Sequence, residues 1–264
     1  LATCSVLWRA IAQGQISLDD FVSPTIFPDV DTWRHVTVGQ LVGHASGLPA
    51  WRDLDGDWVS PWFRDFEQSP GLKAVYSDLG YIALGRFLEL RLEAPLDVLF
   101  HRVAARYGLE NATFRPLSAA PTGIDENRGL ISGVVHDPNA FALGGVCGHA
   151  GLFATATDVA NWGESVLAWL ERPATSLGTV IQTCWNTCAA LEPTSWRLGL
   201  DSVTPGKSSA GSYFSDQARG HLGYTGTSIW LEPEQALVVV LLTNRVHPYD
   251  VSNPEIKRFR PRFH

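Results

Sequence analysis

The stretch Gly220-His221-Leu222-Gly223-Tyr224-Thr225-Gly226-Thr227 is the part of the sequence that decides its fold. It opens an apolar run that predicts a strand over 221–231, and Glu232-Pro233-Glu234 predicts a hairpin turn into a second strand over 236–243. The three glycines leave the backbone bare, so we expect an open sheet edge that a ligand or another chain approaches closely. The histidine is expected to face that open region.

The remaining sequence predicts mainly helices, because apolar residues recur at helical spacing. A third strand is expected at about 196–202, and a short helix is expected after Pro254. This order of elements indicates an α+β fold in one domain over 1–264, with a helical region at about 20–190 between the first helix and the strands of 196–243. The predicted helices cover about 1–13, 37–42, 79–93, 95–107, 157–171 and 174–190.

Composition excludes several classes of protein. The 264 residues carry a net charge of −7, which argues against a nucleic-acid binder, and no apolar run is long enough for a membrane span. The cysteines Cys4, Cys147, Cys184 and Cys188 show no zinc-binding pattern, so free thiols are expected. Free thiols slightly favour a cytoplasmic location.

The sequence begins with Leu1 and contains no methionine, which indicates an incomplete natural product. Three strands alone would also leave a sheet edge and a sheet face uncovered. We therefore expect N-terminal strands of the fold to be absent from this chain.

Five segments in order resemble the serine β-lactamase-like hydrolases, the family of class C β-lactamases, D-alanyl-D-alanine carboxypeptidases and related esterases. The resemblance covers nearly the whole chain and implies the β-lactamase/transpeptidase-like fold. It also implies an acyl-enzyme mechanism without a cofactor, acting on a small-molecule or peptide-like ester or amide. The segments are Gly14–Asp20, Val36–Pro49, Tyr76–Tyr81, Gly148–Phe153 with Thr157-Asp158, and Gly220–Thr227.

The resemblance assigns roles to individual residues. Tyr76 matches the tyrosine of the family's Tyr-x-Asn element and would transfer a proton, while Asp78 stands where the family often has asparagine. His221 replaces the lysine of Lys-Thr-Gly and would orient or polarise the substrate. The backbone N–H of Tyr224 would be the second oxyanion-hole donor, beside that of the nucleophile. The alternative is that Tyr76 and His221 are structural residues.

The nucleophile of this family is a serine in a Ser-x-x-Lys motif, and the chain contains no such motif in the expected place. Ser5 is not a substitute, because Trp8 stands where the lysine is needed. The alignment places the motif just before Leu1. Two hypotheses remain open: the motif lies upstream, or the protein is a catalytically inactive binding module for peptidoglycan fragments or a protein partner.

The substrate-binding residues expected from the sequence are Asp78, Gly223, His136 and Asn139, although the last two could instead brace a loop. A neutral histidine and Leu222 in place of Lys-Thr cannot hold a substrate carboxylate, which favours an esterase or amidase over a β-lactamase. We expect His44 and His149 to hold backbone groups at turns, and the eight histidines form no metal-ligand pattern.

Overall fold

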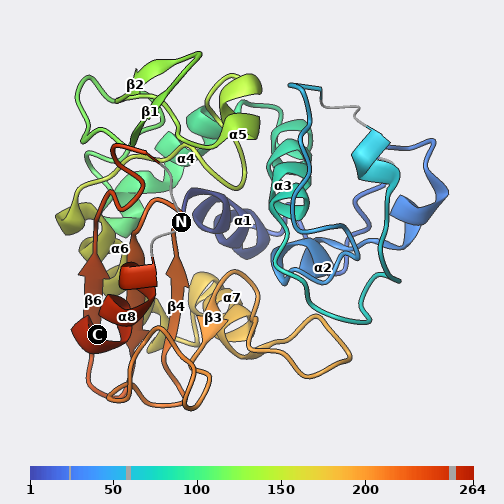
Figure 1. Ribbon diagram of the computed structural model, residues 1–264. Coiled ribbons are helices and arrows are strands. Elements are labelled where there is room, and N and C mark those ends of the chain that lie inside the picture. Colours follow the sequence, from blue (N-terminus) through green and yellow to red (C-terminus); the bar gives the residue numbers. More distant parts are fainter. Residues whose placement is uncertain (24, 58–60, 250–253) are drawn as a thin grey trace.

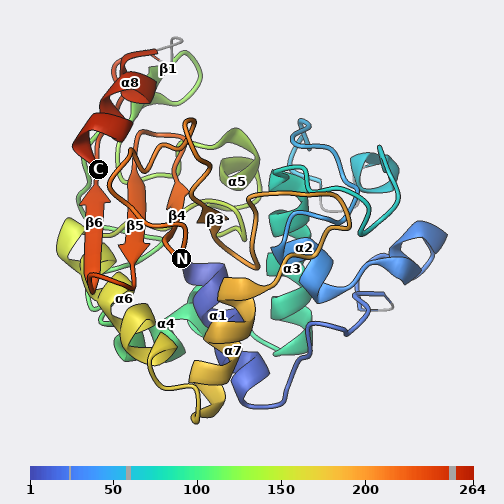
Figure 2. The ribbon, with the colours of Figure 1, turned by 90° about the horizontal axis from the view of Figure 1, so that it is seen from below.

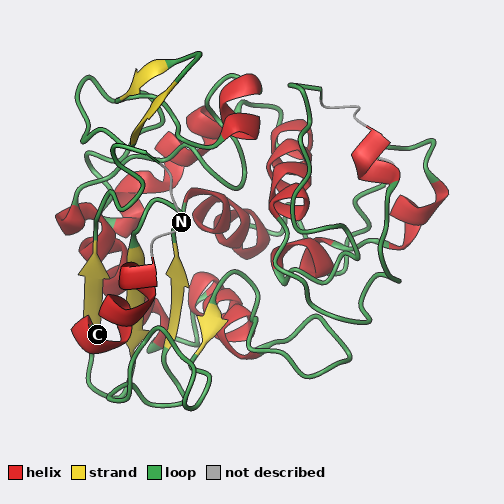
Figure 3. Cartoon of the chain, viewed as in Figure 1, coloured by secondary structure: helices red, strands yellow, loops and turns green. Residues whose placement is uncertain are grey.

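The computed structural model describes residues 1–23, 25–57, 61–249 and 254–264. An antiparallel sheet lies on one side of α1 (Ala2–Ala12), and a mainly helical region lies on the other side (Figure 1). The helical side contains α2 (Val38–Val42), α3 (Asp78–Arg91) and the short turns η1 (Asp31–His35) and η2 (Pro61–Arg64). Figure 3 shows helices and strands in separate layers, which confirms the α+β class.

The main sheet contains four strands in the order β3-β4-β5-β6, all antiparallel. Their bounds are β3 (Asp201–Ser202), β4 (Arg219–Leu222), β5 (Ser228–Glu232) and β6 (Leu237–Leu241). In β4, the partners of the two residues of β3 are Arg219 and Gly220, so the part of β4 that carries His221 extends beyond β3. β4 lies between β3 and β5 and is therefore not the edge strand that the sequence predicts, although its end at His221 and Leu222 lines a cavity.

The predicted strand over 221–231 is wrong, because the chain turns back within it. β4 ends at Leu222, and β5 begins at Ser228 and pairs with β4 in the register His221 to Ile229. The glycines serve this hairpin rather than a ligand, since a Cβ on Gly220 would overlap the Trp230 ring and a Cβ on Gly223 would overlap Thr227 Oγ1. The alternation of apolar residues could not reveal the reversal, because it continues from one strand into the next.

Other elements agree with the sequence to within a few residues. The exceptions are the strand expected at 196–202, of which only β3 forms, and the helix expected at 174–190, which ends at Asn186. A small hairpin of β1 (Gly123–Asp125) and β2 (Gly129–Ile131) was not predicted, and neither were η1, η2 and the short helix at Pro138–Ala142. The remaining elements are α4 (Leu96–Ala104), η3 (Ala105–Tyr107), α5 (Pro138–Ala142), α6 (Ala156–Leu170), α7 (Ser176–Asn186) and α8 (Pro254–Phe263).

Helices cover both faces of the sheet (Figure 2). α6 packs against β5 and β6 on one face, and α8 lies on the opposite side. The last turns of α8 bind the β4–β5 hairpin directly, because Arg260 Nη2 donates to the carbonyls of Gly223 at 3.0 Å and Thr227 at 2.8 Å. The position of the hairpin therefore depends on the C-terminal helix.

Helix α1 is the centre of the core and contacts α3, α4 and α7. Its Trp8 stacks on Trp162 of α6, with ring centroids 5.9 Å apart. Ser5 is completely buried and accepts a hydrogen bond from Trp162 Nε1 at 2.9 Å. It therefore cannot act as a nucleophile, as the sequence indicates.

Segment 147–149 is pressed between α1 and α3. Thr3 Oγ1 donates to the Gly148 carbonyl, and a Cβ on Gly148 would overlap the Tyr81 carbonyl of α3. Only glycine fits this position, because any side chain would separate the segment from the helix.

Two expectations about composition can be compared with the structure. All four cysteines are free thiols, which confirms the sequence prediction, and three of them are buried. Among the described residues, no helix has the length and apolar character needed to cross a membrane.

Replacing Gly148 by alanine should lower the free energy of unfolding by about 1–3 kcal/mol, because the added methyl group meets backbone that has no room to move. Urea denaturation monitored by circular dichroism measures this change. Gly80→Ala is the matched control, since a Cβ there meets its nearest neighbour, Ser46 Oγ, at an ordinary 3.5 Å. Equal stabilities for the two variants would contradict the close packing of Gly148.

Candidate active site

A cavity of about 1230 Å³ lies where the sheet, the helical region and α1 meet. Its wall includes the start of α3, the end of β4 with the following turn, and the segments around 134–138 and 147–155. The first residues of α1, Leu1 to Cys4, also line it. Segments far apart in the sequence thus share one enclosure that is large enough for a small-molecule substrate.

Tyr76 and His221 face each other across this cavity, with ring centroids 6.0 Å apart. Trp196 joins them, at 5.3 Å from Tyr76 and 5.7 Å from His221. Tyr76 keeps 41% of its surface exposed, whereas Ser77 beside it is buried and caps α3 by accepting from the Gly80 N–H. The structure therefore brings together the two side chains on which the sequence prediction depends.

His44 holds the backbone that carries Tyr76. Its Nδ1 accepts a hydrogen bond from the Ser77 N–H at 3.1 Å, and its ring packs on that of Tyr76 with centroids 4.7 Å apart. Burial, with a smaller contribution from His221, lowers the pKa of His44 to about 3, so the ring is neutral near pH 7. The expected role of this histidine at a turn is confirmed.

His221 is also neutral near pH 7. Burial is the largest cause that lowers its pKa, to about 4. Its Nδ1 lies 2.8 Å from the Leu222 carbonyl and acts as the donor, which leaves Nε2 as an acceptor. The ring can therefore orient a donor group on a ligand, but it cannot attract a carboxylate by charge.

Gly223 and Tyr224 form the turn between β4 and β5. The Gly223 N–H donates to the Thr227 carbonyl at 2.7 Å, so it serves the turn rather than a ligand. The Tyr224 peptide is fixed from the other side, since Arg245 Nε donates to its carbonyl at 2.9 Å and the guanidinium lies 4.7 Å from the centroid of its ring. Both residues line the cavity.

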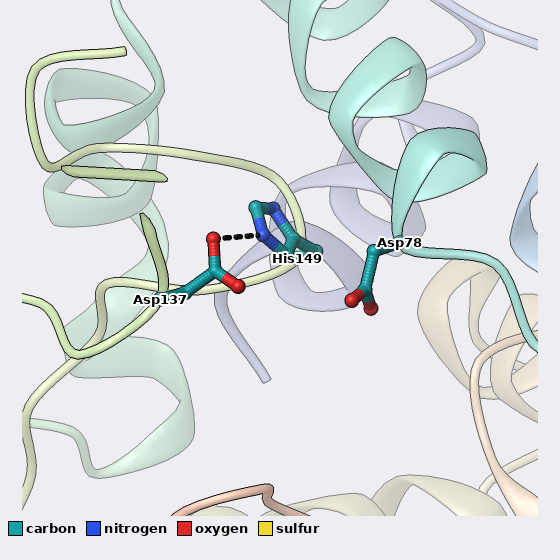
Figure 4. Close-up of side chains that lie close together, drawn as sticks. All are labelled: Asp78, Asp137 and His149. Atoms are coloured by element: carbon teal, nitrogen blue, oxygen red, sulfur yellow. Dashed lines mark hydrogen bonds and ion pairs between the residues drawn. The ribbon is translucent and has the colours of Figure 1, made fainter. Parts of the chain in front are cut away.

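Asp78, Asp137 and His149 form a charged cluster beside Tyr76 (Figure 4), with potential ligand atoms within 4.8 Å of one another. His149 Nε2 lies 2.8 Å from Asp137 Oδ1, and the Asp78 carboxylate is near enough to the Tyr76 hydroxyl to raise the pKa of that phenol. Desolvation opposes the charge on His149, but the bond to Asp137, together with the neighbouring Cys147, raises its pKa to about 10. A protonated imidazole offers no lone pair to a metal ion, so we describe the cluster as an ion-pair cluster.

The other two predicted binding residues differ from each other. His136 lines the cavity, with Nδ1 3.2 Å from Thr122 Oγ1 and its ring 6.0 Å from that of Tyr224. Asn139 is 1% exposed, and its amide accepts from the Leu54 N–H and donates to the Arg52 carbonyl. The structure does not place Asn139 over the cavity, because both ends of its amide brace a loop.

The charges that line the cavity largely cancel one another. Arg128 pairs with Asp125 at 3.7 Å and donates to the Val135 and His136 carbonyls, and His149 pairs with Asp137. Among the described lining residues, Asp78 is the exception, because its carboxylate forms no ion pair within 4.0 Å. Desolvation raises the pKa of the Asp78 carboxyl group. Desolvation of the Tyr76 hydroxyl, and after it the nearby Asp78, raise the pKa of Tyr76 above its usual range.

Sequence reasoning missed the Asp137–His149 pair. His149 was expected to hold a backbone group, but it binds a carboxylate twelve residues earlier in the chain. The sequence did contain a signal, because His136-Asp137-Pro138-Asn139 precedes the glycine-rich turn at 144–151. His136 and Asn139 were predicted as binding residues from this segment, whereas Asp137 is the residue that binds His149. Asp137 has a second function, because its carboxylate caps α5 through the Ala140 N–H at 2.7 Å.

Comparison with known proteins agrees with this geometry. The family model described as Beta-lactamase matches residues 1–259. The chain belongs to the β-lactamase family. It is therefore a hydrolase of the serine β-lactamase type, and the resemblance found in the sequence is confirmed.

Three similar proteins illustrate the range of this family. A protein of Escherichia coli O157:H7, provisionally named as a D-alanyl-D-alanine carboxypeptidase, is 28% identical over 96% of this chain and 68% of its own length. A class C β-lactamase mutant superimposes with a TM-score of 0.72 at 14% identity, over 99% of this chain and 78% of that one. A hydrolase with promiscuous acyltransferase activity gives 0.68 at 20% identity, over 98% and 82%. The two structures establish the fold.

Stability should fall as the pH drops below about 6.5, the usual pKa of histidine. Below that pH, His44 is protonated in the unfolded chain, whereas in the folded chain its pKa of about 3 keeps it neutral. Proton binding therefore favours the unfolded chain. His221, with its pKa lowered to about 4, contributes in the same direction. Urea titrations at pH 7.5, 6 and 5 measure the slope.

The matched variants for this measurement are His44→Asn and His101→Asn. Asparagine tolerates the positive φ of 56° at residue 44 and offers an oxygen to the Ser77 N–H, but it does not titrate. His44→Asn should therefore flatten the slope, whereas a change at the exposed His101 should not. An unchanged slope in His44→Asn would rule out a buried neutral imidazole.

Proposed function

We propose that this protein hydrolyses uncharged esters or amides through an acyl-enzyme, with the nucleophilic serine and its lysine on the turn that precedes Leu1. One observation carries the proposal: the Tyr76 and His221 rings stand 6.0 Å apart in a cavity that the first residues of α1 enter. Leu1 and Ala2, at the beginning of α1, line the same cavity as the His221 ring. A serine one or two turns earlier would project between the two rings.

The proposed mechanism assigns one task to each side chain. The serine hydroxyl transfers its proton to the Tyr76 oxygen as it attacks the substrate carbonyl, and the Tyr76 proton passes to Asp78. The proton then returns by the same route to the leaving group. The developing oxyanion is held by the N–H groups of the serine and Tyr224. His221 accepts a hydrogen bond at Nε2 and orients the substrate or the nucleophile.

The substrate class follows from the charges of the cavity. The cations among its described lining side chains, Arg128 and His149, are already paired with aspartates, and His221 is neutral. None of these described side chains therefore offers an unpaired cation to a substrate carboxylate, and the lysine of the proposed motif is assigned to the serine and Tyr76. The carboxypeptidase name of the Escherichia coli relative implies a peptide with a terminal carboxylate, so we place this chain closer to the ester-cleaving members of the family.

Tyr76→Phe should lower turnover of p-nitrophenyl acetate about 10²-fold or more, because it removes the oxygen that accepts the serine proton. The chain extended by the residues that its gene encodes before Leu1 is the enzyme to assay, by release of p-nitrophenolate. Tyr213→Phe, on an exposed loop, is the control and should retain full activity. Saturable ligand binding without turnover in the extended chain would favour the inactive binding module instead.

A neutral p-nitrophenyl butyrate should have a kcat/KM at least tenfold above that of the carboxylate-bearing p-nitrophenyl hemisuccinate. His221→Lys should reduce this preference about tenfold or more, because a charge-assisted hydrogen bond to the carboxylate contributes about 1.5–3 kcal/mol. Equal kcat/KM values for both esters in the unmodified enzyme would contradict the proposed substrate class.

A further inference from the structure

The Asp137–His149 pair lies outside the proton path proposed above, yet it stands next to it. His149 is 4% exposed at its side chain, and its backbone is fixed because Gly148 has no room to move between α1 and α3. Asp137 is fixed as the N-cap of α5. Two separate elements therefore hold this pair rigidly beside Asp78, the first residue of α3 (Figure 4).

We propose that His149, held by Asp137, is a positioning residue that keeps Asp78 charged and thereby sets the direction of the hydrogen bond between Asp78 and Tyr76. The proposal rests on the proposed function, because it explains how Tyr76 is prepared to accept a proton.

Two carboxylates of the cluster repel each other. Asp78 and Asp137 offer oxygens within the same 4.8 Å cluster, and two carboxylates so close in a half-buried site would favour protonation of one of them. A cation between them removes this tendency. His149 supplies that cation across the neutral range, because its bond to Asp137 at 2.8 Å and the neighbouring Cys147 raise its pKa to about 10.

The charge on Asp78 decides which way the Tyr76 hydroxyl points. A charged carboxylate only accepts, so the Tyr76 O–H donates to Asp78 and leaves the phenol lone pairs for the serine proton. A protonated Asp78 can donate to the phenol oxygen, which occupies one of those lone pairs and turns the hydroxyl proton towards the nucleophile. The second arrangement cannot receive the serine proton.

The other titratable groups around Tyr76 do not provide this control. His44 from the turn after α2 and His221 from β4 both have lowered pKa values and are neutral near pH 7. Of the charged groups that act on Asp78, His149 stabilises the carboxylate, and Asp137 disfavours it. The lysine of the proposed Ser-x-x-Lys motif would add a second cation from α1, and it is held constant when variants at residue 149 are compared.

The first experiment needs no turnover and uses the chain as it stands. Aspartate carboxyl carbons labelled with ¹³C are titrated by NMR, and the Asp78 signal is assigned with Asp78→Asn. In His149→Gln the midpoint of Asp78 should rise by about one pH unit or more, the shift typical of losing an opposite charge at this distance. His101→Gln, on the exposed face of α4, should leave it unchanged. An unmoved midpoint in His149→Gln overturns the proposal.

A second variant separates charge from packing. His149→Lys retains a cation beside Asp137 and should keep the Asp78 midpoint near that of the unmodified chain. A folded His149→Lys that titrates like His149→Gln overturns the proposal. If either variant fails to fold, ¹⁵N imidazole shifts of the unmodified chain decide, because His149 must remain protonated through neutral pH. Titration of His149 near pH 6.5 overturns the proposal.

The second experiment uses the extended enzyme and its pH–rate profile for p-nitrophenyl butyrate. The acidic limb should move to higher pH in His149→Gln, since Asp78 then takes up its proton earlier. A purely structural role would instead lower kcat equally at every pH and leave the limb in place, which overturns the proposal. An extended chain without turnover contradicts the proposed function alone, because the carboxyl titration still tests the role of His149.

Discussion

The contact between Gly148 and helix α3 is the constraint on which the candidate site depends. It brings a loop from the middle of the chain against the helix that begins with Asp78, while Thr3 ties the same loop to α1. Three segments thereby meet at one point of the cavity wall. Without this contact, Asp78 and His149 would belong to separate parts of the surface, and the cavity would lose the wall that joins its two sides.

The electrostatic character of the site follows from this close packing. Burial removes the charges that water would otherwise support, so His44 and His221 are neutral and the Tyr76 phenol is held in its protonated form. A side chain keeps its charge where an oppositely charged side chain is in direct contact, as in the Asp137–His149 and Asp125–Arg128 pairs. The cavity therefore combines an apolar, aromatic side with one compact charged corner.

The sequence predicted the class of fold and the facing pair of Tyr76 and His221, because these depend on local signals. Helix starts such as Thr37 and Thr155 carry recognisable caps, and the motif order identifies the strand that bears His221 and the segment before α3 that bears Tyr76. It could not predict that 221–231 is a hairpin or that Asn139 braces a loop. Periodicity does not register a chain reversal, and the partners of an amide depend on contacts with residues 52–54, more than eighty positions away. The Asp137–His149 pair could not be predicted for the same reason, because no sequence pattern indicates a contact between two polar residues of a loop.

The attachment of α8 to the β4–β5 hairpin has a practical consequence. Arg260 donates to two carbonyls of the turn that carries Tyr224, and His264 Nδ1 and Nε2 lie within hydrogen-bonding distance of the Ser209 carbonyl and Ser228 Oγ. Helix α8 and His264 therefore work as a clamp on the side of the cavity that the β4–β5 hairpin forms. Affinity tags or fusion partners joined to this helix would pull on that clamp. Protein engineers should therefore choose another anchoring point, such as the exposed loop near Leu191, when immobilising the protein or attaching a reporter.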